Sequence, residues 1–288
     1  MLPREVLSGQ ILFGERRHAI YTVLPFLEPG LMLDVGAAAG AFTYLMLKMN
    51  PQSRVYAFEP FPGNHPFFEK RLAGDQRATL IKKAVGEKPA TVNFYVSSVV
   101  SGSEKGWSEM AGYSSLGHIV SAFNPKSMKS ISVECCRIDD VADDHVRFCK
   151  IDVQGGELGV LKGAQGLISG KGIDVLFVEF GGELEILEFA SANGYAIFDS
   201  EYIITPVKSA AGARNWNIFH EVAKSTGSTG QLAWPVAPPR DFGGYCKWLK
   251  SEFNRIGSIS TDLVFVREDY IPKILEAAAK AITKGPLF

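Results

Sequence analysis

Short apolar runs typical of β-strands alternate with segments of helical periodicity along most of the chain. Strands are expected at residues 31–35, 55–58, 79–83, 90–96, 131–136, 148–152, 174–179, 195–198 and 260–267. Helices are expected at residues 41–49, 66–72, 138–142, 156–167, 183–192 and 270–283. Regular alternation of strand and helix predicts an α/β fold, with a largely parallel sheet and helices on both of its faces.

Two regions at or near the ends of this pattern have a different character. Residues 1–30 predict an N-terminal helical cap that stops at a Pro-Gly turn signal. Residues 31–288 are expected to form one domain, with an insertion at about 205–258 before the last strand. Pro and Gly interrupt that insertion, and its aromatic residues are interleaved with Lys and Arg. It suits either recognition of a sugar or planar substrate, or packing and dimerisation.

A long polar stretch, residues 97–130, separates two of the expected strands. It is rich in Ser and Gly and also carries aromatic residues and His118. A loop of this length in a compact domain is usually either functional or disordered, and we expect a lid that orders over substrate. A histidine titrates near neutrality, so His118 is one candidate for a catalytic base, although a His in a polar loop is more often simply solvated.

The turn between the first strand and its helix reads Asp-x-Gly-x-x-x-Gly, from Asp34 through Gly36 to Gly40. Glycines without a Cβ let the backbone approach a ligand at the start of a helix, although they can also merely shape a turn. A dinucleotide-binding site typically has the motif Gly-x-Gly-x-x-Gly. Asp34 stands in place of the first glycine, and its carboxylate would repel a pyrophosphate. The turn therefore favours a cationic ligand without phosphate. Glu59, which ends the second apolar run, is suitably spaced to bind both hydroxyls of a ribose.

Four acids end four of the expected strands: Asp34, Glu59, Asp152 and Glu179. In an open parallel sheet, ligands bind outside the carboxyl ends of the strands, so these acids are expected on one rim. The alternative for each is a structural role, because Asp and Glu also cap helix N-termini.

Composition limits the function classes. Of 288 residues, 46% are hydrophobic and 21% charged, as in an ordinary globular protein. A net charge of -1 gives no basic footprint for nucleic acid. No apolar run is long enough to span a membrane, and the N-terminus lacks a signal-peptide pattern, so a cytoplasmic location is expected. The cysteines, whose spacing fits no zinc site, are expected as free buried thiols: Cys135, Cys136, Cys149 and Cys246.

These stretches together resemble the FkbM family of S-adenosylmethionine-dependent methyltransferases, which mostly methylate hydroxyls. The matching pieces are Asp34-Val35-Gly36-Ala37 with Gly40, Ala57-Phe58-Glu59-Pro60, Ala84-Val85-Gly86, Ser114-Ser115-Leu116, Lys150-Ile151-Asp152-Val153-Gln154-Gly155-Gly156-Glu157 and Leu161-Lys162-Gly163-Ala164. The resemblance implies a Rossmann-like class I methyltransferase fold with a mostly parallel seven-stranded sheet. The sequence departs from the family pattern at Gln154, where a glutamate is usual. The region 205–258 matches nothing in the family.

The resemblance also implies a cofactor site for S-adenosyl-L-methionine. Asp34 and the glycine turn would face the methionine end, Glu59 the ribose, Ala84 and Val85 the adenine, and the serines of the long loop would close over the ligands. The cofactor-binding residues implied in this way are Asp34, Gly36, Ala37, Gly40, Phe42, Thr43, Glu59, Pro60, Ala84, Val85, Ser114, Ser115 and Asp152.

The chemistry implied is an in-line methyl transfer to the hydroxyl of a small molecule or glycan. The protein would hold the two reactants at attack distance and accept the hydroxyl proton. Candidate bases are Asp152, Glu179 and His118, with Asp152 first. Asp152 and Glu179 could instead hold a divalent cation, but no His-rich ligand set supports a metal site.

Three alternatives remain. An NAD-dependent oxidoreductase is disfavoured by Asp34, and a non-catalytic binding module by the joint presence of Asp34, Glu59 and Asp152. A nucleic-acid methyltransferase fits poorly with the near-neutral charge. A homodimer is a further expectation.

Overall fold

The computed structural model describes residues 23–97, 114–115, 128–199, 205–208, 244, 247, 251, 261–274 and 276–277. The chain divides into two compact units. One comprises residues 30–47 and 52–172, and the other comprises residues 1–29, 48–51 and 173–288.

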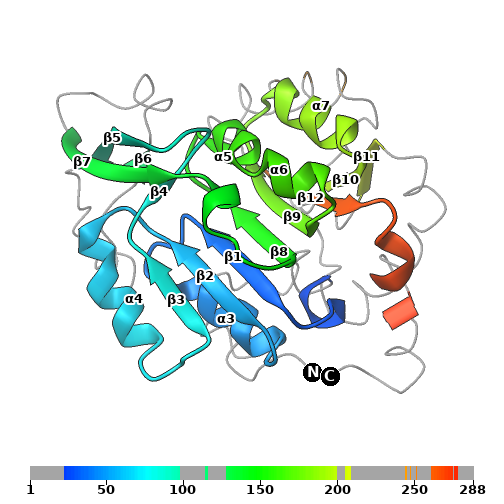
Figure 1. Ribbon diagram of the computed structural model, residues 1–288. Helices are drawn as coiled ribbons and strands as arrows, with labels where there is room; N and C mark the ends of the chain where they lie inside the picture. Colours follow the sequence, from blue (N-terminus) through cyan, green and yellow to red (C-terminus); the bar gives the residue numbers. More distant parts are fainter. Residues whose placement is uncertain are drawn as a thin grey trace. The chain divides into compact units, whose positions relative to one another are not determined.

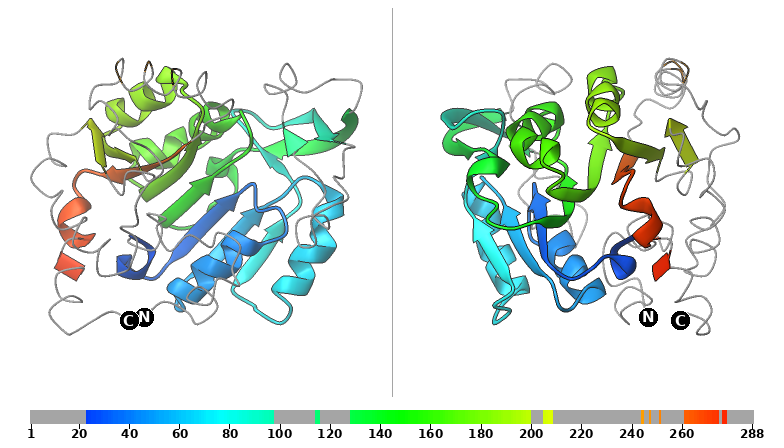
Figure 2. Two further views of the ribbon diagram at one scale, coloured as in Figure 1. Left: turned by 180° about the vertical axis from the view of Figure 1, so that it is seen from behind. Right: turned by 45° about the vertical axis from the view of Figure 1, so that its right-hand side comes forward.

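The unit of residues 30–47 and 52–172 contains parallel strands in the order β8-β1-β2-β3. Their bounds are β1 Leu31–Val35, β2 Arg54–Phe58, β3 Ala78–Ile81 and β8 Val146–Ile151. Helix α3 (Ala41–Met49) follows β1, and α4 (His65–Arg71) follows β2. Figures 1 and 2 show α3 against one face of these strands. The strand–helix alternation predicted from the sequence is confirmed here.

Strand β1 has the composition of a strand covered on both faces. All five of its residues are buried, and Asp34 is the only charged one among them. It pairs with β2 on one side and β8 on the other, so that Asp34 lies opposite both Ala57 and Lys150. A continuous apolar run is typical of a central parallel strand, and a buried carboxylate in it requires a partner.

The same unit holds a second, smaller sheet that the sequence did not predict as separate. Its order is β4-β7-β5-β6, and only the β4–β7 pairing is parallel. The bounds are β4 Ala84–Val85, β5 Ala90–Ser97, β6 Ser114–Ser115 and β7 Met128–Cys136. Its small core consists of Ala84, Phe94, Val133 and Cys135.

The single helix expected at 156–167 is wrong, because the chain forms two helices there. Helix α5 is Glu157–Gly163 and α6 is Gln165–Ser169. The carboxylate of Asp139, in the 3-10 turn Ile138–Asp140, accepts the backbone N–H groups of Gly166 and Leu167 at 2.9 and 3.0 Å. A distant side chain thus caps the start of α6, which sequence periodicity cannot reveal.

The other unit has antiparallel strands in the order β11-β10-β12-β9. Their bounds are β9 Ile173–Phe180, β10 Tyr195–Asp199, β11 Thr205–Lys208 and β12 Thr261–Arg267. Helix α7 is Leu184–Ala192. Residues 1–22 of the expected N-terminal helical cap lie outside the described residues, and Leu24–Phe26 form a 3-10 turn. The fully buried Asp174 pairs with Arg267 at 3.0 Å. Most of the 205–258 insertion and of the 97–130 loop lies outside the described residues.

Among the residues that the structure describes, no helix is long and apolar enough to cross a membrane. Cys135, Cys136 and Cys149 are buried free thiols, as predicted, and Cys246 lies outside the described residues. Burial raises the pKa of the Cys136 thiol to about 11.

Candidate functional site

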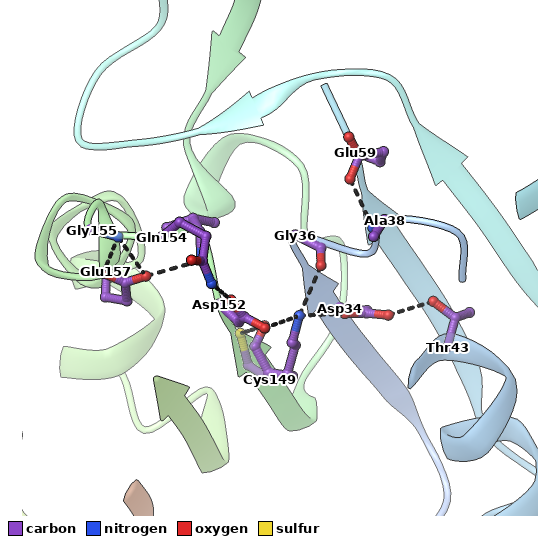
Figure 3. Close-up of polar contacts among 12 residues, drawn as sticks. Asp34, Gly36, Ala38, Thr43, Glu59, Cys149, Asp152, Gln154, Gly155 and Glu157 are labelled. Atoms are coloured by element: carbon purple, nitrogen blue, oxygen red, sulfur yellow. Dashed lines mark hydrogen bonds and ion pairs between the residues drawn. The ribbon is translucent and has the colours of Figure 1, made fainter. Parts of the chain in front are cut away.

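Backbone N–H groups of the turn after β1 donate hydrogen bonds to acceptors within the protein itself. The amides of Gly36 and Ala37 both donate to the carbonyl of Phe58, each at 3.0 Å. The amide of Ala38 donates to Oε2 of Glu59 at 2.8 Å (Figure 3). A turn that binds a pyrophosphate offers such N–H groups to the ligand. These three amides already have acceptors, so this turn is not built as an anion site.

Both glycines of the turn have packing reasons within the protein. Gly36 has φ +82°, and a Cβ there would lie 1.9 Å from the carbonyl oxygen of Asp152. Gly40 has φ +77°, and a Cβ there would lie 2.7 Å from the ring of Phe68. The interpretation that the glycines shape the turn accounts for both, while ligand approach at these positions stays a prediction.

Asp34 lies at the centre of the site with no exposed surface. Its Oδ2 accepts a 2.6 Å hydrogen bond from the hydroxyl of Thr43, in the first turn of α3. Its Oδ1 accepts no hydrogen bond among the described residues and lies 3.6 Å from Nζ of Lys150. Burial raises the pKa of Asp34, and the Lys150 ammonium and the Thr43 hydroxyl partly oppose this.

Lys150, the fifth residue of β8, is a site residue to which the sequence analysis gave no role. Its side chain is only 5% exposed, and its Nζ donates to the carbonyl of Gly36 at 2.8 Å. The same Nζ lies 3.3 Å from Oδ2 of Asp152 and 5.6 Å from the centre of the Phe42 ring. A lone lysine inside the apolar run of residues 148–151 was the available signal, because a buried ammonium requires acidic partners.

Asp152 follows the end of β8 and keeps 36% of its side chain exposed. Its Oδ1 accepts a 2.8 Å hydrogen bond from Nε2 of Gln154, and its Oδ2 faces Lys150. Gln154 has φ +59°, the left-handed region that a residue with a side chain rarely adopts. The amide therefore reaches Asp152 from a strained backbone, which is a pattern common at functional sites.

Glu157 is the first residue of α5, and the sequence analysis assigned it no function. Its carboxylate accepts the backbone N–H of Val153 at 3.0 Å and that of Gly155 at 3.0 and 3.1 Å (Figure 3 shows the Gly155 contacts). The side chain therefore fixes the loop that carries Asp152 and Gln154. Glu157 is buried, and burial raises its pKa.

Glu59 directly follows β2 and is only 3% exposed. Its two oxygens accept the amides of Ala38 and Phe61, each at 2.8 Å. The Asn64 side chain also hydrogen-bonds to this carboxylate, so of its roughly four lone-pair positions about one is left for a ligand donor such as a ribose hydroxyl. Burial raises the pKa of Glu59, and the two amide hydrogen bonds oppose this. The backbone carbonyl of Glu59 also contacts Nε2 of His65 at 2.9 Å.

The structure thus brings four of the predicted site residues together: Asp34, Gly36, Thr43 and Asp152. Ala37, Phe42, Ala84 and Val85 are buried, the last two in β4. Ser114 and Ser115 form β6 against β5, and Pro60 follows Glu59. Glu179 is the seventh residue of β9, in the other compact unit, so a common rim for all four acids stays a prediction. His118 lies outside the described residues.

No group of three or more His, Cys, Asp or Glu side chains that could hold a metal ion occurs in the described part of the chain.

The family model described as "Methyltransferase FkbM domain" matches residues 34–197, more than half of this chain. A curated relative, Methyltransferase 1 of Beauveria bassiana (strain ARSEF 2860), is 24% identical over 162 residues. That match covers 50% of this chain and 61% of the relative's length.

Two solved structures are also similar. Methyltransferase FkbM from Methylobacillus flagellatus KT is 21% identical, with 60% of this chain and 40% of that chain covered and a TM-score of 0.41. An O-methyltransferase from a trans-AT PKS multienzyme of Brevibacillus brevis, in complex with S-adenosyl-L-homocysteine, is 14% identical. Its alignment covers 98% of this chain and 83% of that chain, again with a TM-score of 0.41.

Proposed function

Since this chain belongs to the FkbM methyltransferase family, we propose that it is an S-adenosylmethionine-dependent O-methyltransferase. The acceptor would be a hydroxyl of a small molecule or glycan. The single observation that supports this proposal most is the pairing of the buried Asp34 carboxylate with a turn whose amides are already satisfied. Such a turn suits a ligand that is cationic and has no phosphate in contact with it.

The residues present fit S-adenosylmethionine on chemical grounds. The Oδ1 atom of Asp34 is buried and accepts no hydrogen bond among the described residues, although the Lys150 ammonium lies 3.6 Å away, so a cationic group of the cofactor would still be favoured near this carboxylate. Glu59 keeps lone-pair capacity for a ribose hydroxyl, while its own position is fixed by the Ala38 and Phe61 amides and the Asn64 side chain. Ala84 and Val85 supply apolar surface that suits an adenine ring.

When bound, the cofactor would supply an electrophilic methyl group on a positively charged sulfur. The chain would contribute position and proton transfer. Glu59 would orient the ribose, and Asp34 with the Gly36 turn would face the charged methionine end. Holding both reactants in near-attack geometry supplies much of the acceleration in such displacements.

Asp152 is the leading candidate for the base that accepts the hydroxyl proton. Its ion pair with Lys150 and the hydrogen bond from Gln154 both stabilise the ionised carboxylate, which is the form that can accept a proton. Part of the side chain remains exposed and can reach an acceptor. Glu179 and His118 are the other candidates for this base. We also propose that the protein forms a homodimer and is located in the cytoplasm.

The test is calorimetric titration of the full chain with S-adenosylhomocysteine, with NAD as a parallel ligand. Saturable binding of S-adenosylhomocysteine alone supports the proposal, and transfer of radiolabelled methyl groups to a panel of sugar and polyketide hydroxyls would then identify the acceptor class. Binding of NAD alone would favour the oxidoreductase alternative. Binding of neither would favour a non-catalytic module.

A further inference from the structure

One ammonium group lies among oxygens from three residues in two segments of the chain, β1 with its following turn and the loop after β8. Nζ of Lys150 is 2.8 Å from the carbonyl oxygen of Gly36, 3.3 Å from Oδ2 of Asp152 and 3.6 Å from Oδ1 of Asp34. Asp34 belongs to β1, Gly36 to the turn after it, and Asp152 to the loop after β8 (Figure 3). Lys150 is therefore positioned to hold the glycine turn, the buried acid and the candidate base in one arrangement.

We propose that Lys150 is a positioning residue of the cofactor site, whose ammonium supplies the countercharge for Asp34 and ties the Gly36 turn to Asp152. This inference rests on the proposed function only for the identity of the ligand. Lys150 itself would touch neither the methyl group nor the acceptor.

Charge balance explains why the site requires this lysine. Ionised Asp34 and Asp152 with protonated Lys150 carry a net charge of about -1, from two carboxylates and one ammonium. Without the ammonium, Asp34 would be a fully buried carboxylate whose remaining hydrogen bond, among the residues that the structure describes, comes from the neutral hydroxyl of Thr43. Such a group takes up a proton instead of staying charged.

Several other groups face this cluster. Phe42 and Thr43 of α3 are uncharged. Cys149 of β8 is fully buried, and burial raises its pKa, so its thiol stays neutral. Asp152 is partly exposed and accepts the Gln154 amide, so its ionised form is stabilised without Lys150. Glu157 interacts electrostatically with Asp152, but its oxygens are held by backbone amides. Asp34 is therefore the group that loss of Lys150 would affect most.

The decisive experiment uses Lys150→Met in the full chain. S-adenosylhomocysteine binding is measured by calorimetry from pH 6 to pH 9, and the unfolding midpoint of the ligand-free protein is measured over the same range. In Lys150→Met, affinity should fall about tenfold for each pH unit below the Asp34 pKa, with the transition about one pH unit or more above that of wild type. The unfolding midpoint of this variant should fall as pH rises, because Asp34 then ionises without a countercharge.

Three further variants make the result specific. Lys150→Arg keeps the charge and should restore the wild-type transition. The double variant Asp34→Asn with Lys150→Met removes the acid that has lost its countercharge. It should fold even if the single variant is too unstable to fold. It should also lose the pH transition that Asp34 causes. Lys82→Met removes an exposed lysine of the same unit, whose partner is the exposed Glu69, and should behave as wild type.

Identical pH transitions in wild type and Lys150→Met would overturn the inference, as would a transition that persists in the double variant. Failure of the proposed function would look different. Wild type would then bind no S-adenosylhomocysteine, while the ligand-free unfolding midpoints would still carry the signature of Lys150 and Asp34.

Discussion

The hydroxyl of Thr43 donates a 2.6 Å hydrogen bond to Oδ2 of Asp34, and both residues are fully buried. Thr43 is the third residue of α3, and Asp34 is the fourth of β1. The helix that follows the glycine turn therefore orients the acid that precedes it. This hydrogen bond links α3 directly to β1 across the turn that connects them.

Thr43→Val should destabilise the protein by about 1.5–3 kcal/mol, because it leaves a buried carboxylate oxygen without its donor. Urea unfolding monitored by circular dichroism measures the change. Thr43→Ser keeps the hydroxyl and should lose much less. A loss in Thr43→Val no larger than that in Thr43→Ser would contradict the prediction, because only Thr43→Val removes the hydroxyl donor.

Glu59 and Asp152 should separate binding from turnover. Glu59→Ala should weaken S-adenosylhomocysteine binding by about tenfold or more, because the ribose acid and the acceptor of the Ala38 amide are lost together. Asp152→Ala should largely preserve binding and lower kcat by about 10²–10⁴-fold, as expected for loss of a general base. Calorimetry and a methyl-transfer assay report the two effects. Equal loss of binding in both variants would refute the role given to Asp152.

Gly36→Ala tests the close approach between the turn and the loop after β8. A Cβ at Gly36 would lie 1.9 Å from the Asp152 carbonyl, in addition to the positive φ of +82°. Gly74 has nearly the same φ, +81°, but a Cβ there meets nothing within 4 Å. Gly74→Ala should therefore cost only about 1–2 kcal/mol of backbone strain.

Gly36→Ala should lose more stability than Gly74→Ala, by a further ~1–3 kcal/mol, because the two backbone segments must move apart. Chemical denaturation of both variants gives the comparison. Similar losses would mean that strain alone explains the requirement for glycine at position 36.

The buried Glu157 should make stability depend on pH. Burial raises its pKa, so the folded protein holds this proton more tightly than the unfolded chain does. Its stabilising contribution is then complete below the unfolded pKa of about 4.3 and is lost as pH rises through the higher folded value. Glu157→Gln lacks this titration, so the stability of wild type relative to Glu157→Gln should decline as pH rises through that window.

Thermal unfolding across pH 4 to 8, about the range in which carboxyl groups with raised pKa values titrate, tests this expectation. Glu69→Gln is a suitable control because that carboxylate is 58% exposed and pairs only with Lys82 in the contacts described. A difference between wild type and Glu157→Gln that stays constant with pH would contradict the prediction.

The elements around the glycine turn were predictable because local sequence determines them. The apolar run of β1, the turn glycines and the periodicity of α3 gave both elements with their observed bounds. The two helices α5 and α6 were predicted as one, since the cap that separates them comes from Asp139, about 27 residues earlier in the chain. Hydrophobic periodicity carries no information about such a distant acceptor.

The candidate site was predictable to a similar degree. Asp34, Glu59 and Asp152 were chosen as candidates because each ends an apolar run, and ligands of parallel sheets bind outside the carboxyl ends of the strands. Lys150 was given no role in the sequence analysis. Its partners became evident only when the parallel register placed it opposite Asp34.

The Lys150–Gly36 hydrogen bond joins residues 114 positions apart in the sequence. Closing a loop of this length costs conformational entropy, so we expect this contact to form later in folding than local contacts. The Glu157 contacts to Val153 and Gly155 span only a few residues and can form early. The loop after β8 would thus be shaped before it is joined to the β1 turn. Binding at this site would consequently report on chains that have completed folding and would not detect partially folded intermediates.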